Sequence, residues 1–223
     1  MTGAMLWALL GCGAAPEEEE LSLTPGGDGS ALYERLGRTY QDRDAEALTN
    51  QLEQRHEDAD AVMAWLALKE GMVVADIGCG VGYFTRRLSA AVGPTGTVHA
   101  LDIQPEAIDF LRQELGDDHE NVRLSVNTLD DVKLPEASID FGFMAHLDFY
   151  LQPELMTENT RFLQSVFRAV RPGGQLVVLQ YIAPGQTVDP LSGHFQALGF
   201  VASAVEHDPE HSSYLYRFTR PAR

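Results

Sequence analysis

The chain has 223 residues, 44% of them hydrophobic, a length that suits one well-buried domain better than two. Its 33 acidic residues outnumber its 16 basic residues and give a formal net charge of −17. Because nucleic acids are bound through basic surfaces, this charge argues against a nucleic-acid partner. No apolar run approaches the roughly 20 residues of a membrane-spanning helix. The two cysteines, Cys12 and Cys79, are too few for a disulfide framework.

The first 30 residues differ in composition from the rest of the chain. Residues 4–10 are apolar and lead into Gly11 and Cys12, a pattern that resembles the end of a bacterial lipoprotein signal. Residues 1–11 would then be the signal segment, and a lipid on Cys12 would attach the protein to a membrane of the cell envelope. Residues 12–30 are rich in Ala, Pro, Glu, Gly and Ser and predict a flexible tether. No Lys or Arg precedes Cys12, so a cytoplasmic protein with a mis-assigned start codon or a chance match is the alternative.

Residues 31–223 predict one α/β domain. Apolar spacing over residues 31–54 predicts one or two amphipathic helices, and residues 60–68 predict another. Residues 31–70 would thus form a helical cap, acting either as a lid over an acceptor pocket or as a cover for a sheet edge. The expected strands are 72–76, 97–102, 121–126, 138–144, 175–182, 200–206 and 212–219, and the later helices are 82–92, 105–115, 158–170 and 188–198.

This alternation predicts a three-layer sandwich, in which helices cover both faces of a mostly parallel seven-stranded sheet. The last two strands are joined by a short turn at residues 208–210, so the C-terminal strand should run antiparallel to its neighbour. In sheets of this kind a ligand binds at the carboxyl ends of the strands. Asp76, Asp102 and Asp130 each lie at or just beyond such an end.

The most informative segment is a buried strand that ends in Asp76 and leads into Gly78, Gly80 and Gly82. Without a Cβ atom, glycines let the backbone approach a ligand, and the following helix offers free N–H groups. A carboxylate at Asp76 would repel a pyrophosphate but suits an ammonium or sulfonium group. The G-x-G-x-G register also differs from a dinucleotide-binding G-x-G-x-x-G, because Tyr83 occupies the place of the third glycine. The segment therefore favours S-adenosylmethionine (SAM) over a dinucleotide.

This loop resembles the first motif of the Rossmann-like, class I SAM-dependent methyltransferases. Four later features match that family in order: Asp102 after the second strand, Asp130 after the third, the strand 138–144, and the Arg-Pro-Gly-Gly turn at 171–174. The resemblance extends from about Tyr33 to the C-terminus. It implies a Rossmann-like fold and a transferase that moves a methyl group from SAM to an unidentified small-molecule acceptor.

The resemblance also implies which residues hold the donor. The loop from Gly78 to Gly82, with Cys79 and Gly80, would line the methionine and ribose parts of SAM. Asp76 would lie near the amino-acid end, and Asp102 would accept hydrogen bonds from the ribose hydroxyls. Cys79 is interpreted as a small packing residue rather than a nucleophile.

The adenine end is expected to lie against residues that follow the second and third strands. By the same resemblance, Ile103 would pack on the ring and Asp130 would accept from the adenine amino group. The neighbouring Asp131 could serve in place of Asp130. Ala145, at the end of the fourth strand, is the last residue expected to contact the donor.

The segment after the fourth strand carries the candidate catalytic residues His146, Asp148 and Tyr150. His146 is either a general base, since imidazole titrates in the useful range, or a polar residue of a loop that closes over SAM. Related methyltransferases often carry an acid followed by Tyr-His-His here, and this chain departs from that pattern. The histidines lack metal-ligand spacing, so we expect no metal.

Two other classes of function remain open. A SAM-binding module without transfer activity could act as a sensor or bind a partner, either free or lipid-anchored. A dehydrogenase is a more distant alternative, because Asp102 alone does not separate SAM from NAD. Lipidation at Cys12 would raise the question of SAM supply, since SAM is made in the cytosol. The sequence leaves the oligomeric state open.

Overall fold

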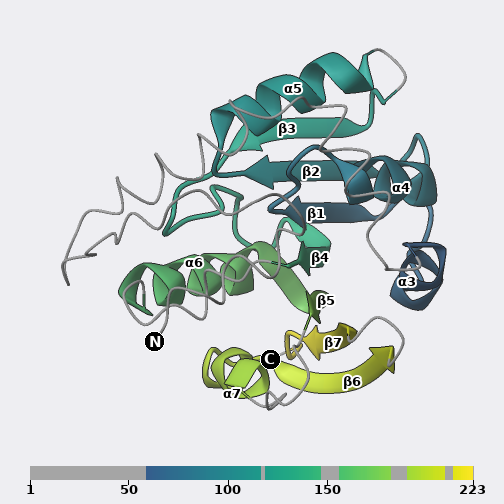
Figure 1. The fold of residues 1–223 in the computed structure, drawn as a ribbon. Coiled ribbons are helices and arrows are strands. Elements are labelled where there is room, and N and C mark those ends of the chain that lie inside the picture. The colour runs from purple at the N-terminus through teal and green to yellow at the C-terminus, as the bar shows by residue number, and fades with distance from the viewer. Residues whose placement is uncertain (1–58, 117–118, 147–155, 182–189, 209–212, 223) are drawn as a thin grey trace, which may run out of the picture.

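The computed structural model describes residues 59–116, 119–146, 156–181, 190–208 and 213–222 (Figure 1). Cys12, the tether and the helices expected over residues 31–54 lie outside these residues, as do Asp148 and Tyr150. The described elements are α3 (Ala59–Leu66), β1 (Val73–Ile77), α4 (Tyr83–Val92), β2 (Thr97–Asp102), α5 (Pro105–Leu115), β3 (Val122–Val126), β4 (Ile139–Ala145), α6 (Met156–Ala169), β5 (Val170–Tyr181), α7 (Pro190–Ala197), β6 (Val201–Asp208) and β7 (Ser213–Thr219).

The seven strands form one sheet in the order β3-β2-β1-β4-β5-β7-β6, which Figure 1 shows from the top to the bottom of the view. Neighbours from β3 to β5 pair in parallel, whereas β7 runs antiparallel to both β5 and β6. This arrangement confirms the predicted fold class and its antiparallel C-terminal strand. The chain order reverses between β1 and β4, so the carboxyl end of β1 is the expected place for a ligand.

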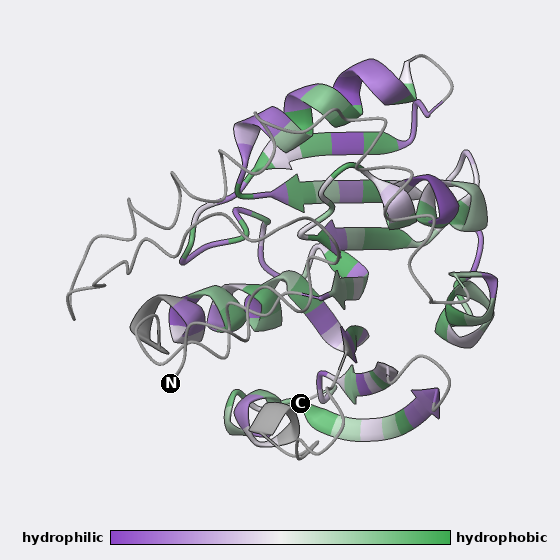
Figure 2. Cartoon of the chain, in the orientation of Figure 1, coloured by the Kyte–Doolittle hydropathy of each residue, from purple (hydrophilic) through white to green (hydrophobic). Residues whose placement is uncertain are grey.

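Alternate residues of the strands build two cores, one on each face of the sheet. On β5, Leu176 and Val178 join a core with residues of α6 and α7, while Val177 and Leu179 join one with residues of α3 and α4. This period of two is what side chains on opposite faces of a strand produce. Figure 2 shows hydrophobic residues along the central strands and a mixture of hydrophilic and hydrophobic residues on α4 and α5. No helix among the described residues is both long and apolar enough to cross a membrane.

Strand β5 begins five residues earlier than predicted, at Val170 rather than at Gln175. Ile139 of β4 pairs with Val170, and Phe141 pairs with Gln175, so the Pro-Gly-Gly turn forms an irregularity inside the strand. The turn is held by Arg220, whose backbone N–H donates to Gly174 O at 2.9 Å. The sequence correctly indicated a turn. In the structure this turn pairs with Arg220, near the C-terminus, and so becomes part of the sheet.

Arg217 of β7 attaches helix α3 to the sheet. Its guanidinium donates to Gln175 Oε1 at 2.7 Å and to the carbonyl of Leu66, at the end of α3, at 3.4 Å. It also lies 4.4 Å from the centroid of the Trp65 ring. A cation at the end of a helix satisfies carbonyl groups that have no partner within the helix. This described part of the predicted cap is therefore packed on the domain.

Candidate functional site

Three glycines with positive φ carry the chain from β1 to α4. Gly78, Gly80 and Gly82 have φ angles of 78°, 52° and 84°, in the region that favours glycine. The N–H groups of Gly78 and Cys79 donate to Leu101 O of β2 at 2.7 and 2.9 Å. The loop is therefore fixed against the end of β2, at the expected ligand edge.

Asp102 joins this loop to the start of α5. Its carboxylate is buried, with Oδ2 accepting from Gly80 N at 2.8 Å and Oδ1 accepting from Gln104 N at 2.9 Å. Burial raises the pKa of Asp102, against the lowering effect of hydrogen bonds from the backbone N–H groups of Gln104, Gly80 and Ile103. A carboxylate has about four lone-pair sites, so beside these three donors Asp102 retains the capacity to accept from one further hydroxyl group.

Asp76 is a second buried carboxyl group, only 3% exposed, on the neighbouring strand. Its Oδ2 accepts from Thr85 Oγ1 of α4 at 2.6 Å. Burial raises the pKa of Asp76 from its ordinary value of 3.8 to about 7; the Thr85 hydrogen bond opposes this rise, and the charge of Asp102 adds to it. Neither acid belongs to an ion pair among the described residues. A ligand that carries positive charge would relieve the cost of holding these two acids together.

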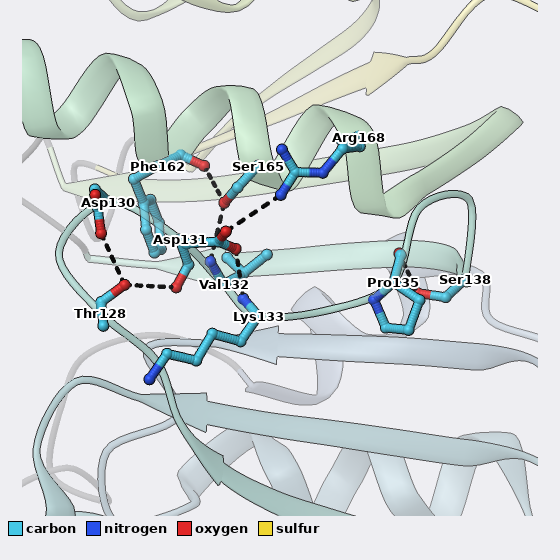
Figure 3. Close-up of polar contacts among 10 residues, drawn as sticks. All are labelled: Thr128, Asp130, Asp131, Val132, Lys133, Pro135, Ser138, Phe162, Ser165 and Arg168. Atoms are coloured by element: carbon cyan, nitrogen blue, oxygen red, sulfur yellow. Dashed lines mark hydrogen bonds and ion pairs between the residues drawn. The ribbon is translucent and has the colours of Figure 1, made fainter.

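Asp130 and Asp131 have different surroundings, which Figure 3 shows. Asp131 accepts from Lys133 N at 2.7 Å and from Arg168 Nη2 of α6 at 3.3 Å, so its carboxylate holds the loop to that helix. Asp130 is exposed, and Thr128 Oγ1 donates to its Oδ1 at 2.9 Å. The carboxylate of Asp130 therefore contributes less to holding the fold together than the carboxylate of Asp131 does.

Two residues with amide side chains, which we did not predict, contact Asp102 through their backbone N–H groups. Asn127 follows β3, and its N–H donates to Asp102 O at 3.0 Å, while Gln104 N donates to the Asp102 side chain. Both residues are buried, and the Asn127 Oδ1 and Gln104 Oε1 atoms have no hydrogen-bond partner among the described residues. The sequence-based prediction considered acidic residues after the strands and did not include these neutral amides. Their places directly after strands β2 and β3 were the signal that would have found them.

Cys79 lies in the glycine loop, and Ile103 directly follows Asp102. Cys79 is buried, and burial together with the charges of Asp102 and Asp76 raises the pKa of its thiol well above the ordinary value. A thiol that holds its proton is a poor nucleophile, which supports the interpretation of Cys79 as a packing residue. Ile103 follows Asp102 and is partly exposed, as a surface for an aromatic ring requires.

His146 has a backbone conformation that is uncommon for residues other than glycine. It follows Ala145, the last residue of β4, with a φ of 53°, and its N–H donates to Leu179 O of β5 at 2.9 Å. Strained residues of this kind concentrate at functional sites. His146 thus lies at the carboxyl edge of the sheet. Within the described part of the chain, His, Cys, Asp and Glu form no group of three or more that could hold a metal ion.

Comparisons with known proteins agree with this geometry. Residues 74–174, which include the glycine loop and Asp102, match the family model described as a methyltransferase domain. A ubiquinone/menaquinone biosynthesis C-methyltransferase of Citrobacter koseri is 28% identical over 155 residues, which are 66% of this chain and 59% of that protein. The chain therefore aligns with less than two thirds of the length of this relative.

The solved structures decide the fold. A SAM-dependent methyltransferase from Aquifex aeolicus superposes with a TM-score of 0.66, at 22% identity, over 80% of this chain and 99% of that chain. The chain has a methyltransferase fold. A chain from a Haloferax volcanii complex that contains the Trm112 methyltransferase activator shares this fold with a TM-score of 0.65 and 18% identity, over 79% of this chain and 95% of that chain. The methyltransferase fold places the glycine loop, Asp76 and Asp102 at one edge of its sheet.

Proposed function

We propose that the protein is a SAM-dependent methyltransferase that acts on a small molecule. The observation that carries the proposal is the pair of buried acids, Asp76 and Asp102, beside a glycine loop and without a basic partner among the described residues. The methyltransferase fold and the match of residues 74–174 support it. SAM, when bound, supplies an electrophilic methyl group on a sulfonium.

The chain's own residues bind and orient the donor. Asp102 accepts from the ribose hydroxyls, and Asp76 lies toward the charged amino-acid end. Ile103 packs on the adenine. Asp130 accepts from the adenine amino group, and Asn127 Oδ1, which has no partner among the described residues, is a second acceptor of the same kind. This set of acceptors fits a ligand rich in N–H and O–H donors.

Because of Asp76, we expect both the stability of the protein and its affinity for SAM to depend on pH. Its pKa is raised in the folded protein, so between about pH 4 and 7 the folded state keeps a proton that the unfolded state loses. Asp76 therefore lowers the stability of the ligand-free protein as pH rises through this window, by an amount on the order of a few kcal/mol. Affinity for SAM should change in the opposite direction, because the positively charged ligand favours the ionised acid.

The Asp76→Asn variant tests this linkage, since it can keep the hydrogen bond from Thr85 but cannot ionise. We expect wild-type affinity for SAM, measured by calorimetry, to rise between pH 5.5 and 7.5, and that of Asp76→Asn to rise less. The amino group of SAM titrates equally in both experiments. Equal pH profiles of SAM affinity for the two proteins would show that ionisation of Asp76 does not contribute to SAM binding.

His146 is the proposed general base, because it lies at the carboxyl end of β4 in a strained conformation. Asparagine tolerates the same φ, so His146→Asn should fold normally while lowering kcat by about 10²- to 10⁴-fold. An unchanged rate in this variant would leave His146 as a loop residue that covers SAM. Asp148 and Tyr150 stay predictions, outside the described residues.

The acceptor requires an activity screen. The named relative acts in ubiquinone and menaquinone biosynthesis as a C-methyltransferase, so acceptors from those routes are the first compounds to assay. Release of S-adenosylhomocysteine (SAH), the demethylated product, would be followed by mass spectrometry. The departure at residues 145–150 favours one alternative, a SAM-binding sensor or partner-binding module. SAH binding without turnover on any acceptor would support that alternative over the enzyme.

Lipid attachment at Cys12 is a separate proposal. It is supported by the apolar segment that precedes the cysteine and by the Gly- and Glu-rich residues that follow it. Mass spectrometry of the N-terminus of the native protein tests it directly. An acylated Cys12 would place the protein at a membrane, whereas an unmodified N-terminus in the cytosolic fraction would exclude the anchor.

A further inference from the structure

Gln104 occupies a position that usually serves to cap a helix. Helix α5 begins at Pro105, so Gln104 is its N-cap residue, with φ −95° and ψ 112°. Short polar side chains are preferred there, because their oxygen reaches the free N–H groups of the first turn. The Gln104 side chain makes no such hydrogen bond. The stability of α5 therefore does not account for a glutamine at this position.

Burial of the Gln104 carboxamide is energetically unfavourable. The residue is 4% exposed, and its Oε1 has no hydrogen-bond partner among the described residues. A buried acceptor without a donor destabilises the protein, because it has given up its hydrogen bonds with water. Because a carbonyl oxygen can only accept, the group that would offset this cost must bring an N–H or an O–H.

The neighbours of Gln104 indicate which donor that is. Its backbone N–H donates to Asp102 Oδ1 at 2.9 Å, and Gly80 N donates to the other oxygen of the same carboxylate at 2.8 Å. With the further bond from Ile103 N–H, the carboxylate has one lone-pair site left. A ribose has two adjacent hydroxyl groups, so a second acceptor oxygen on a residue bonded to Asp102, such as Gln104, would share the work of binding them.

We propose that Gln104 is a further ligand-binding residue, whose carboxamide oxygen accepts a hydrogen bond from a ribose hydroxyl of SAM. This inference rests on the proposed function, because it takes the SAM site as given. Gln104 then helps to select a ribonucleoside over a deoxyribonucleoside. Its buried oxygen gains its partner only when the ligand is bound.

The test compares Gln104→Met with the wild type and with Gln113→Met. Methionine keeps the length of the side chain but removes the polar group, and Gln113 is an exposed glutamine on the same helix. Calorimetry should show SAH binding weakened about 2- to 12-fold in Gln104→Met, the range for one neutral hydrogen bond, and unchanged in Gln113→Met. Ligand-free Gln104→Met should be at least as stable as the wild type, because it loses an unpaired buried amide.

Deoxy analogues of SAH separate a hydroxyl contact from a general defect. With the 2′-deoxy or the 3′-deoxy compound, whichever lacks the hydroxyl that Gln104 binds, Gln104→Met and the wild type should have equal affinity. Equal affinity of the two proteins for SAH itself would overturn the inference, as would a defect that persists with both analogues. A wild-type protein that does not bind SAH would instead overturn the proposed function, and this inference with it.

Discussion

Replacing Asp102 with alanine is expected to weaken binding of SAH by about 5- to 150-fold, which corresponds to the loss of a charged hydrogen-bond partner worth about 1–3 kcal/mol. Asp102 is buried at the end of β2 and accepts from the N–H groups of Gly80 and Gln104. Its removal takes away the proposed ribose contact and also the hydrogen bond that holds Gly80 of the glycine loop. Calorimetric titration of SAH into both proteins measures the effect.

Two further variants make this prediction specific. Asp109 lies on α5 with a mostly exposed side chain paired to Arg112, so Asp109→Ala removes one acid from the same region without touching the site. We expect it to bind SAH as the wild type does. Asp102→Asn preserves shape but turns an amide N–H toward a backbone donor, so it should also bind weakly. Wild-type affinity in Asp102→Ala would refute the ribose assignment.

Replacing Gly82 with alanine is expected to lower the free energy of unfolding by about 2–5 kcal/mol. Two effects add at this position. Gly82 has a φ of +84°, which costs about 1–2 kcal/mol for a residue with a Cβ atom. The new Cβ atom would also lie 2.3 Å from Leu111 Cδ1, and Leu111 is fully buried in the core beneath α5 and cannot easily move. Urea denaturation gives the change in unfolding free energy.

Matched variants separate the backbone effect from the steric one. Gly116 also has a positive φ, of +54°, but a Cβ atom there would meet nothing within 4 Å. Gly116→Ala should therefore show only a backbone cost, which at its ψ of −144° is about 1–3 kcal/mol. The double variant Gly82→Ala with Leu111→Ala should be more stable than the sum of its single variants implies, because the clash is removed. Simple additivity would show that the contact with Leu111 is not the cause.

The sequence predicted the order of strands and helices well, because each element has a clear period and clear ends. The strand 97–102 and the helix 105–115 coincide with β2 and α5. Errors came from contacts between distant segments. Strand β5 begins early because Arg220, some fifty residues later, pairs with the turn at Gly174. No local pattern in the sequence contains that information.

The candidate site, like the fold, could be predicted only in part from the sequence. Asp76, the glycines and Asp102 could be proposed because charge and backbone freedom are visible in the sequence, and the structure places them at one edge of the sheet. Gln104 and Asn127 were missed, because a neutral amide shows its importance only through burial and an unpaired oxygen. The acceptor was not predictable, since the glycine loop and the acids concern only the methyl donor.

The central claim is that the loop from Gly78 to Gly82, with the two buried acids, forms a site for SAM. The measurement that tests it most directly is calorimetric titration of the full-length protein with SAH and, separately, with NADH. The account predicts saturable binding of one SAH per chain and no binding of NADH. Binding of NADH without SAH would indicate a dehydrogenase, and binding of neither ligand would contradict both the enzyme and the sensor hypotheses.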